Sequence, residues 1–285
     1  MYIIKIFSDF ADSTKCKEVY ENICNTSKMF DYGENKKIFI TDGENYTHAV
    51  IMNTCMPTLH IPKENVIGLA FEPYEFLRLF NNSNPFINYA KNHISKYYIG
   101  DKRELPEPFV EHFGYMWYST PHKSLEDKQH IMSICVSEKR SAPGHVYRHT
   151  LIEKIIQYNL PIDIYGRGSA KYKYYKHSKG EFKDVEPYEN YLFSICIENY
   201  QNNDYISEKF ITPLLHNCMP IYSGCKHINK YFDDDNMILL TNNAEQDIHI
   251  IISVLTNPQR YYKKTYTEKN IKTVNFIENV ERLFG

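Results

Sequence analysis

The stretch from residue 191 to residue 224 constrains the fold of this chain most, because it combines an apolar strand, a polar turn and a helix. Residues 191–197 are mostly apolar and predict a buried strand. Asp204 is expected to cap the helix that follows the turn. In an α/β domain, a unit of this kind presents polar groups to a ligand at the carboxyl edge of the sheet. The helix carries a predicted core stripe of Phe210, Ile211, Leu214 and Leu215.

The start of this helix favours an anionic ligand. Its exposed N–H groups and positive dipole end attract negative charge, and Lys209 adds a full positive charge. A phosphate group fits this description. An ordinary strand, turn and helix with solvated Glu208 and Lys209 would have the same spacing, so spacing alone leaves both interpretations open.

The residue types in this stretch resemble the signature of the α-1,3-fucosyltransferases, glycosyltransferase family 10. That signature reads Phe-Glu-Asn-Ser, three variable residues and Asp-Tyr-Val-Thr-Glu-Lys, and Glu198-Asn199 and residues 204–209 match it with conservative changes. Two departures are visible. Ile197 replaces a Phe, and Asn217 replaces the glycine that ends the helix, a position that Asn fills because it tolerates the left-handed conformation.

The resemblance implies roles for five residues in binding the sugar donor. Arg148 occupies the place of the arginine that grips the donor diphosphate, and Lys209 shares that task. Glu208 would hydrogen-bond the donor sugar or ribose. Asn199 and Tyr205 would shape the same pocket. Without the resemblance, Arg148 would read as a surface arginine of the helix predicted over residues 144–157.

Glu72 is the candidate catalytic base. It ends the strand predicted over residues 66–71, and the family places its base at the end of a comparable strand. The alternative is that Glu72 caps a helix starting at Pro73. Glu75 is the second candidate, and Asp101, which follows a predicted strand at residues 96–99, is the third.

The fold implied by the resemblance is α/β of the GT-B type, with two Rossmann-like domains facing each other across a cleft. Residues 1–124 would form the acceptor-binding domain and residues 125–285 the nucleotide-sugar domain. The polar segment 119–128 is the candidate boundary. The final helical stretch, from about residue 258 to residue 284, is the candidate for packing back on the first domain.

The reaction implied is an inverting transfer of fucose from GDP-fucose to a hydroxyl of a glycan acceptor, with no metal and no other cofactor. Alternatives are a relative that uses another nucleotide sugar and a glycan-binding relative without catalysis. The clamp residues Arg148, Glu208 and Lys209 argue against the latter, since a lectin does not need them. A dinucleotide or methyl-transfer enzyme is disfavoured because no Gly-x-Gly-x-x-Gly follows the first strand.

Other possible metal or disulfide sites have simpler interpretations. His145 and His149 lie four residues apart but lack the intervening Glu of a metalloprotease helix and an evident third ligand. Residues 233–235 contain an Asp-x-Asp, for which a solvated turn is the simpler reading. The seven cysteines are odd in number and several lie in apolar runs, which predicts reduced core residues.

Composition agrees with a globular protein of two domains. The chain has 285 residues, is 42% hydrophobic and 24% charged, and carries a net charge of −2, which offers no general attraction to nucleic acid or membranes. No run of 18 apolar residues occurs, and residues 2–7 read as a strand instead of a signal peptide. These features predict the soluble bacterial or viral type of the family, located in the cytoplasm of a bacterium or of a virus-infected cell.

Overall fold

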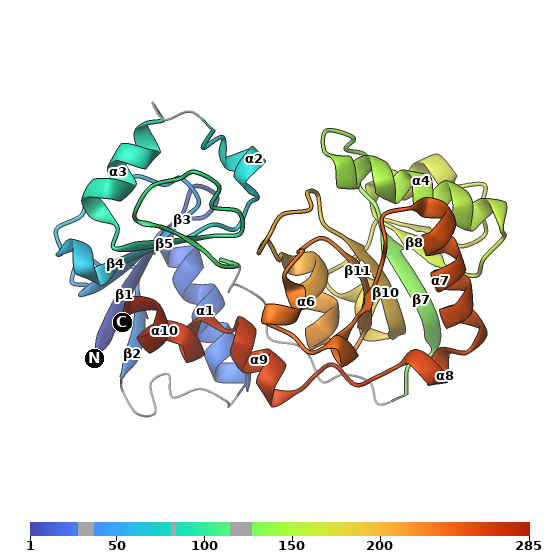
Figure 1. Ribbon diagram of the computed structural model, residues 1–285. Helices are drawn as coiled ribbons and strands as arrows, with labels where there is room; N and C mark the ends of the chain where they lie inside the picture. Colours follow the sequence, from blue (N-terminus) through green and yellow to red (C-terminus); the bar gives the residue numbers. More distant parts are fainter. Residues whose placement is uncertain (28–36, 81–83, 115–126) are drawn as a thin grey trace. The chain divides into compact units, whose positions relative to one another are not determined.

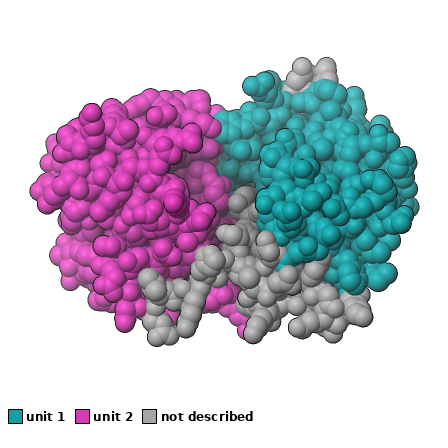
Figure 2. Space-filling view, turned by 180° about the vertical axis from the view of Figure 1, so that it is seen from behind, with its two compact units in different colours: residues 1–120, 202–207, 272–285 teal, residues 121–201, 208–271 magenta. Residues whose placement is uncertain are grey.

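The computed structural model describes residues 1–27, 37–80, 84–114 and 127–285. The chain divides into two compact units, coloured separately in Figure 2. Unit 1 comprises residues 1–120, 202–207 and 272–285, and unit 2 comprises residues 121–201 and 208–271. Unit 1 thus takes two segments from the second half of the chain, so a single boundary near residue 124 does not describe the division.

The described part of unit 1 contains one parallel sheet in the order β2-β1-β3-β4-β5-β6. The chain passes from β1 outward to β2 and then returns to β3 on the other side of β1, where Ile4 lies opposite His48. Because the strands are parallel, the carboxyl ends of β1, β3 and β4 lie at one edge of the sheet. The strands are β1 (Tyr2–Phe7), β2 (Ile38–Thr41), β3 (His48–Met52), β4 (Val66–Leu69), β5 (Lys96–Ile99) and β6 (Phe109–Glu111).

The strands of unit 1 form because they are nearly continuous apolar runs, as expected for a parallel sheet covered on both faces. All four residues of β4 are buried, and Val66 joins Phe86, Ile87 and Ala90 of α3 in one core cluster. Asn84 caps α3 by accepting a hydrogen bond from the Phe86 N–H at 2.9 Å. The helices of the unit's first segment are α1 (Ser13–Ser27), α2 (Tyr74–Leu77) and α3 (Pro85–His93), with a 3-10 turn at Lys63–Asn65.

The described part of unit 2 contains a second parallel sheet, in the order β12-β11-β10-β7-β8-β9. The chain runs outward from β7 through β8 to β9 and then returns to β10 on the other side of β7. The switch point of this sheet is therefore between β7 and β10 (Figure 1). The strands are β7 (His130–Cys135), β8 (Asp163–Tyr165), β9 (Ser178–Gly180), β10 (Tyr191–Ile197), β11 (Met219–Ser223) and β12 (Ile238–Leu239).

Helices cover both faces of this sheet. The apolar sides of α4 and α7, represented by Leu151 and Ile251, join one core cluster with Ile195 of β10. Helix α6 packs on β11, where the ring centroids of Phe210 and Tyr222 lie 4.8 Å apart. The helices are α4 (Pro143–Gln157), α5 (Glu186–Glu189), α6 (Glu208–Leu215), α7 (Ala244–Thr256) and α8 (Pro258–Tyr261), with 3-10 turns at Arg167–Tyr172, Ile228–Lys230 and Asp234–Asn236.

The C-terminal stretch is broken into short helices. After α8, an extended segment leads to α9 (Glu268–Val274) and α10 (Phe276–Phe284). Helix α10 belongs to unit 1, where Phe276 meets Tyr20 at 5.3 Å and the Leu283 carbonyl accepts a hydrogen bond from Tyr98 at 3.0 Å. The end of the chain therefore contributes to the core of the first unit.

Helix α6 confirms its predicted core stripe, since Phe210, Ile211, Leu214 and Leu215 are all buried. The prediction that Asp204 caps this helix is wrong, because the helix begins only at Glu208. Asn217 has the expected left-handed conformation, with a φ of 55°.

Two further sequence expectations have outcomes in the described residues. Six cysteines there carry free thiols: Cys16, Cys55, Cys135, Cys196, Cys218 and Cys225. Among the described helices, none combines the length and the apolar character needed to cross a membrane. Residues 119–126 of the predicted connector lie outside the described residues.

Candidate functional site

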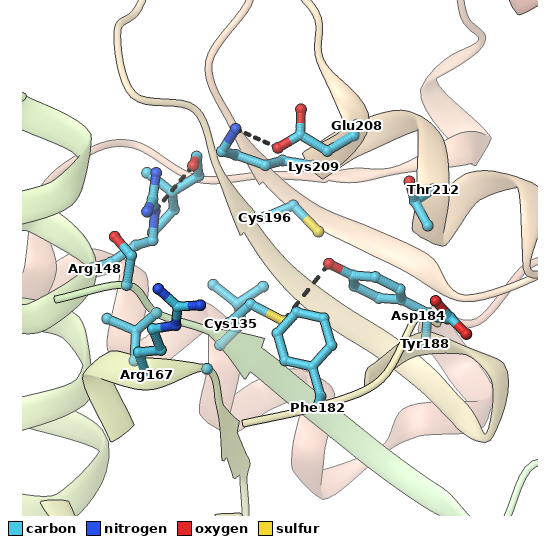
Figure 3. A pocket seen from close by; sticks show the side chains of 15 residues that line it. Cys135, Arg148, Arg167, Phe182, Asp184, Tyr188, Cys196, Glu208, Lys209 and Thr212 are labelled. Carbon is cyan, nitrogen blue, oxygen red and sulfur yellow. Dashed lines mark hydrogen bonds and ion pairs between the residues drawn. The ribbon is translucent and has the colours of Figure 1, made fainter. Parts of the chain in front are cut away.

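A pocket of about 460 Å³ opens at the carboxyl edge of the sheet in unit 2 (Figure 3). Its floor is formed by the ends of β7 and β10, the two strands at the switch point of the sheet, where ligands of open α/β sheets bind. The turn after β8 and the loop before α5 form one wall. Arg148 of α4 and the first turn of α6 supply charged groups. The volume is in the range of small-ligand sites.

Arg148 lines this pocket as a buried cation whose guanidinium is held by two hydrogen bonds. The side chain is only 5% exposed. Its Nε donates to the Ile197 carbonyl at 3.1 Å, and a terminal nitrogen donates to Asn199 Oδ1 at 2.5 Å. Burial lowers the pKa of Arg148, while Glu198 and Glu208 oppose that shift. Arginine still remains charged, so a preoriented positive group points into the pocket.

Lys209 supplies the second cation, from the first turn of α6. Its Nζ lies 2.7 Å from Glu208 Oε1 and 3.7 Å from Glu198 Oε2. Burial alone would lower the pKa of Lys209, but Glu208 and Glu198 outweigh burial and raise it. The ammonium is therefore protonated at neutral pH, and it stands at the N-terminal end of a helix.

Glu198 is the buried counter-ion of this arrangement and was not among the predicted site residues. Its side chain is shielded from solvent, and two glycines make room for it. A Cβ on Gly144 would lie 1.8 Å from the Glu198 carbonyl oxygen, and one on Gly224 would lie 2.3 Å from Glu198 Cγ. Glu198 is part of the family 10 signature, so the sequence marked the residue. Its burial beside the two cations depends on glycines that lie far away in the sequence.

The five predicted donor residues are divided between the two units. Arg148, Glu208 and Lys209 line the pocket, and Asn199 supports Arg148 from beside it. Tyr205 belongs to unit 1, where it is 4% exposed and its hydroxyl donates to the Phe71 carbonyl at 3.3 Å. Tyr205 is not among the residues that line the pocket of unit 2.

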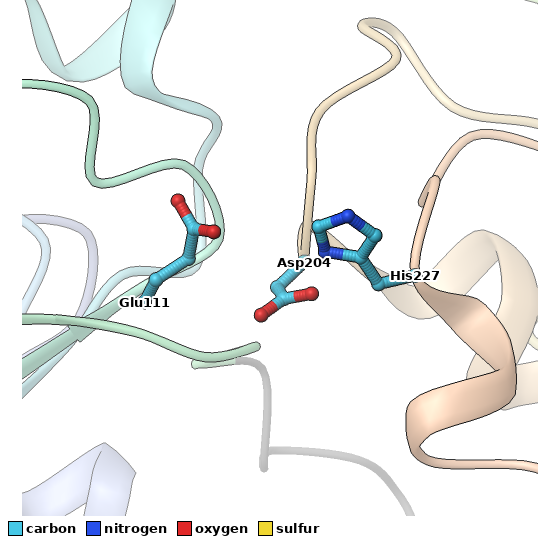
Figure 4. Close-up of side chains that lie close together, drawn as sticks. All are labelled: Glu111, Asp204 and His227. Atoms are coloured by element: carbon cyan, nitrogen blue, oxygen red, sulfur yellow. The ribbon is translucent and has the colours of Figure 1, made fainter.

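Residues 202–207 belong to unit 1 and are held there by specific contacts. The Asp204 N–H donates to the Gly100 carbonyl at 2.6 Å, and Asn203 donates to the Glu111 carboxylate at 3.2 Å. Figure 4 shows Glu111 and Asp204, whose carboxylate oxygens lie within 4.8 Å of each other. A Cβ on Gly100 would lie 2.4 Å from Tyr205 Cα, so only glycine permits this close approach.

Glu72 lies in unit 1, just after β4, at the edge where the carboxyl ends of the strands meet. Its side chain is exposed, and its N–H donates to Asn53 Oδ1 at 3.2 Å. Asn53 also accepts from the Phe71 N–H at 2.9 Å and donates to Asp9 at 3.1 Å. The amide of Asn53 therefore fixes the backbone that carries Glu72. Helix α2 follows Pro73, which stands at its N-cap position and provides no side-chain cap.

The two other candidate bases are engaged by Arg103. That guanidinium bonds Glu75 Oε1 and lies 3.0 Å from Asp101 Oδ2. Glu75 also accepts from Asn202 at 3.2 Å. Glu75 and Asp101 therefore share one arginine partner.

His145 and His149 each have a structural role in α4. His145 Nδ1 accepts from the Ala142 N–H at 3.2 Å, which satisfies a donor at the start of the helix. His149 Nδ1 lies 2.6 Å from the Tyr172 hydroxyl, and Nε2 lies 3.1 Å from the Ser137 carbonyl. These bonds give both imidazoles partners within the protein.

The Asp-x-Asp segment is an exposed turn, as expected. Residues 234–236 form a 3-10 turn. Both oxygens of the Asp233 carboxylate lie 2.7 Å from the Lys269 ammonium, and both side chains are 62% exposed.

Replacing His145 tests the electrostatics of this region. Burial first, and then the charge of Arg148, lower the pKa of His145 to about 4. Below pH 6.5 the unfolded chain therefore binds a proton that the folded protein does not, and stability falls as the pH drops toward 4. His145→Gln keeps an acceptor for the Ala142 N–H but does not titrate. Urea unfolding at pH 7 and pH 5 should show that the variant loses about 2 kcal/mol less than the wild type. Equal losses in both proteins would contradict this assignment.

Comparison with known proteins adds evidence beyond the geometry. The family described as glycosyltransferase family 10 (fucosyltransferase), C-terminal part, matches residues 125–281. The chain is 29% identical over 143 residues to alpha-(1,3)-fucosyltransferase fut-5 of Caenorhabditis elegans, a match that covers 46% of this chain and 36% of that relative. The matched region thus spans about a third of the relative's length.

Solved structures show the same fold. A crystal structure of an alpha1,3-fucosyltransferase with GDP aligns with a TM-score of 0.53 and 13% identity, covering 99% of this chain and 92% of the other. A structure described as alpha1,3-fucosyltransferase with GDP-fucose aligns with a TM-score of 0.51 and 13% identity, covering 99% and 90%. The predicted fold class, α/β of the GT-B type with two Rossmann-like units, is confirmed by this likeness and by the two parallel sheets.

Proposed function

This chain belongs to glycosyltransferase family 10, the fucosyltransferase family, and on that basis we propose that it transfers fucose from GDP-fucose to a hydroxyl of a glycan acceptor. One observation carries the proposal. Arg148 and Lys209 converge on a pocket at the switch point of the sheet in unit 2, which suits the diphosphate of a nucleotide sugar.

The two cations would stabilise the leaving group. As the bond between the anomeric carbon and the diphosphate breaks, negative charge develops on the phosphate oxygens. Arg148 and Lys209 are held in place before the donor arrives, by Asn199 and by Glu198 and Glu208. Stabilisation by preoriented groups requires little rearrangement during the reaction. We therefore propose that this chain needs no divalent metal for donor binding.

Glu208 and Glu72 would complete the chemistry. The Glu208 side chain is about half exposed and bonds Lys209, and its carboxylate would hydrogen-bond hydroxyls of the donor sugar or ribose. Glu72 would remove the proton from the acceptor hydroxyl as that oxygen attacks the anomeric carbon from the face opposite the diphosphate. The configuration at the anomeric carbon is thereby inverted. A general base of this kind contributes a factor of about 100 to 10,000 in rate.

Nucleotide binding tests this proposal directly. We expect the protein to bind GDP more tightly than UDP, CDP or ADP, and to do so in the presence of EDTA. Isothermal titration calorimetry with and without Mg²⁺ measures both properties. Tighter binding of UDP would indicate a transferase that uses another sugar donor. Loss of GDP binding on chelation would contradict the role of the two cations.

Turnover separates an enzyme from a binding protein. Hydrolysis of GDP-fucose, or its transfer to a panel of glycans, should release GDP. A protein that binds glycans but releases no GDP would be a glycan-binding relative, the alternative that the sequence left open.

A further inference from the structure

The wall of the pocket that faces away from Arg148 carries an aromatic ring and a carboxylate. Phe182 and Asp184 lie in the loop between β9 and α5, and both line the pocket. Figure 3 draws Arg148 and Asp184 at opposite sides of it. The diphosphate clamp and this carboxylate are thus separate features of one site.

Phe182 is placed by its neighbours. Its ring meets Tyr165 edge-on, with the centroids 6.2 Å apart, yet 36% of the residue remains exposed. Edge-to-face packing fixes the orientation of a ring and leaves its faces available. A flat ligand group in the pocket can therefore pack against this side chain.

Asp184 has a left-handed backbone conformation, with a φ of 45°. Within the described part of the chain, its carboxylate makes no hydrogen bond and no ion pair. The pocket floor beside it is uncharged, because burial raises the pKa of Tyr188 far above its ordinary value and that of Cys135 to about 12. Asp184 is therefore an acceptor available to a ligand next to neutral, partly apolar surface.

From this arrangement we infer that Asp184 reads the guanine base of the donor, with Phe182 packing against the ring. The inference rests on the proposed function and names the specificity residue of the same site. An ionised carboxylate only accepts hydrogen bonds. Guanine presents two adjacent donors, the N1–H and the 2-amino group, which match its two oxygens.

Other bases lack this pair of donors. Adenine has an acceptor at N1, and uracil has a single N–H between two carbonyl oxygens. Each would place a lone pair against the Asp184 carboxylate, which is unfavourable without water between them. The phosphates are excluded as partners of Asp184 for a similar reason, since like charges repel and Arg148 and Lys209 lie elsewhere in the pocket.

The test compares GDP with inosine diphosphate, which differs from GDP only by lacking the 2-amino group. Calorimetry should show that the wild type binds GDP about tenfold more tightly than inosine diphosphate, the effect of one charge-assisted hydrogen bond. Asp184→Asn should weaken GDP binding by about tenfold or more and bring the ratio of the two affinities close to one. UDP affinity should not fall, because the substitution removes the unfavourable contact between the carboxylate and the uracil carbonyl oxygens.

The choice of variants isolates the carboxylate. Asn tolerates the left-handed conformation at position 184 and preserves the shape of the side chain. Glu189→Gln removes the same charge from the neighbouring helix α5 at a residue that does not line the pocket, so it should leave all affinities unchanged. Circular dichroism and thermal unfolding confirm that the variants are folded.

Three outcomes overturn the inference, and they are distinguishable. If Asp184→Asn keeps the preference for GDP over inosine diphosphate, Asp184 does not read the base. If the variant weakens GDP, inosine diphosphate and UDP equally, the carboxylate contacts the ribose, which all three share. A wild-type protein that binds no GDP contradicts the proposed function itself, and the inference fails with it.

Discussion

We expect Glu72→Gln to slow sugar transfer by about two orders of magnitude or more while leaving donor affinity unchanged. Glutamine keeps the shape and hydrogen bonding of the side chain but cannot take the proton from the acceptor hydroxyl. The turn should survive the change, because Asn53 holds its backbone N–H groups and not the Glu72 side chain. Steady-state transfer rates and GDP-fucose titration measure the two effects separately.

Glu75→Gln is the matched control for this experiment. Glu75 lies one helical turn further along the chain and already bonds Arg103 and Asn202. Its replacement should change the transfer rate little. Near-normal turnover of Glu72→Gln would remove Glu72 from the mechanism, and a large loss in Glu75→Gln or Asp101→Asn would identify the base instead.

The second large effect concerns the diphosphate clamp. Arg148→Ala and Lys209→Ala should each weaken GDP affinity by at least about tenfold, because a charge-assisted hydrogen bond contributes roughly 1.5 to 3 kcal/mol. Both residues also have structural partners, since Arg148 satisfies the buried Ile197 carbonyl and Lys209 pairs with the buried Glu198. Calorimetry with GDP gives the affinity, and thermal unfolding shows whether each variant is folded.

Lys171→Ala provides the control for loss of positive charge. Lys171 also belongs to unit 2 but pairs with Glu153 on the exposed surface and does not line the pocket. Its removal should leave GDP affinity within about twofold, since exposed ion pairs are weak and screened by salt. If Lys209→Ala behaved like Lys171→Ala, the diphosphate would have to lie elsewhere.

Local pattern was sufficient to predict the elements that carry the donor site. Strand β10 is a mostly apolar run, helix α6 has one apolar stripe, and both are observed. Asn217 has a φ of 55°, as the replacement of glycine by Asn suggested. These features depend on residues close in the sequence, and the resemblance to family 10 added Arg148 and Lys209, which the structure brings to one pocket.

Contacts between distant residues decided the rest. The sequence alone was sufficient to predict strand β10, helix α6 and the two cations of the donor site, because hydrophobic periodicity and sequence motifs are local properties. Only the tertiary structure places Tyr205 in unit 1, where Gly100 allows its backbone to approach. Glu198 is enclosed because Gly144 and Gly224 leave space for it. Asp184 enters the pocket through a loop with no motif. These three positions depend on close packing between residues far apart in the chain, and no local sequence pattern indicates which backbone segments will come into contact.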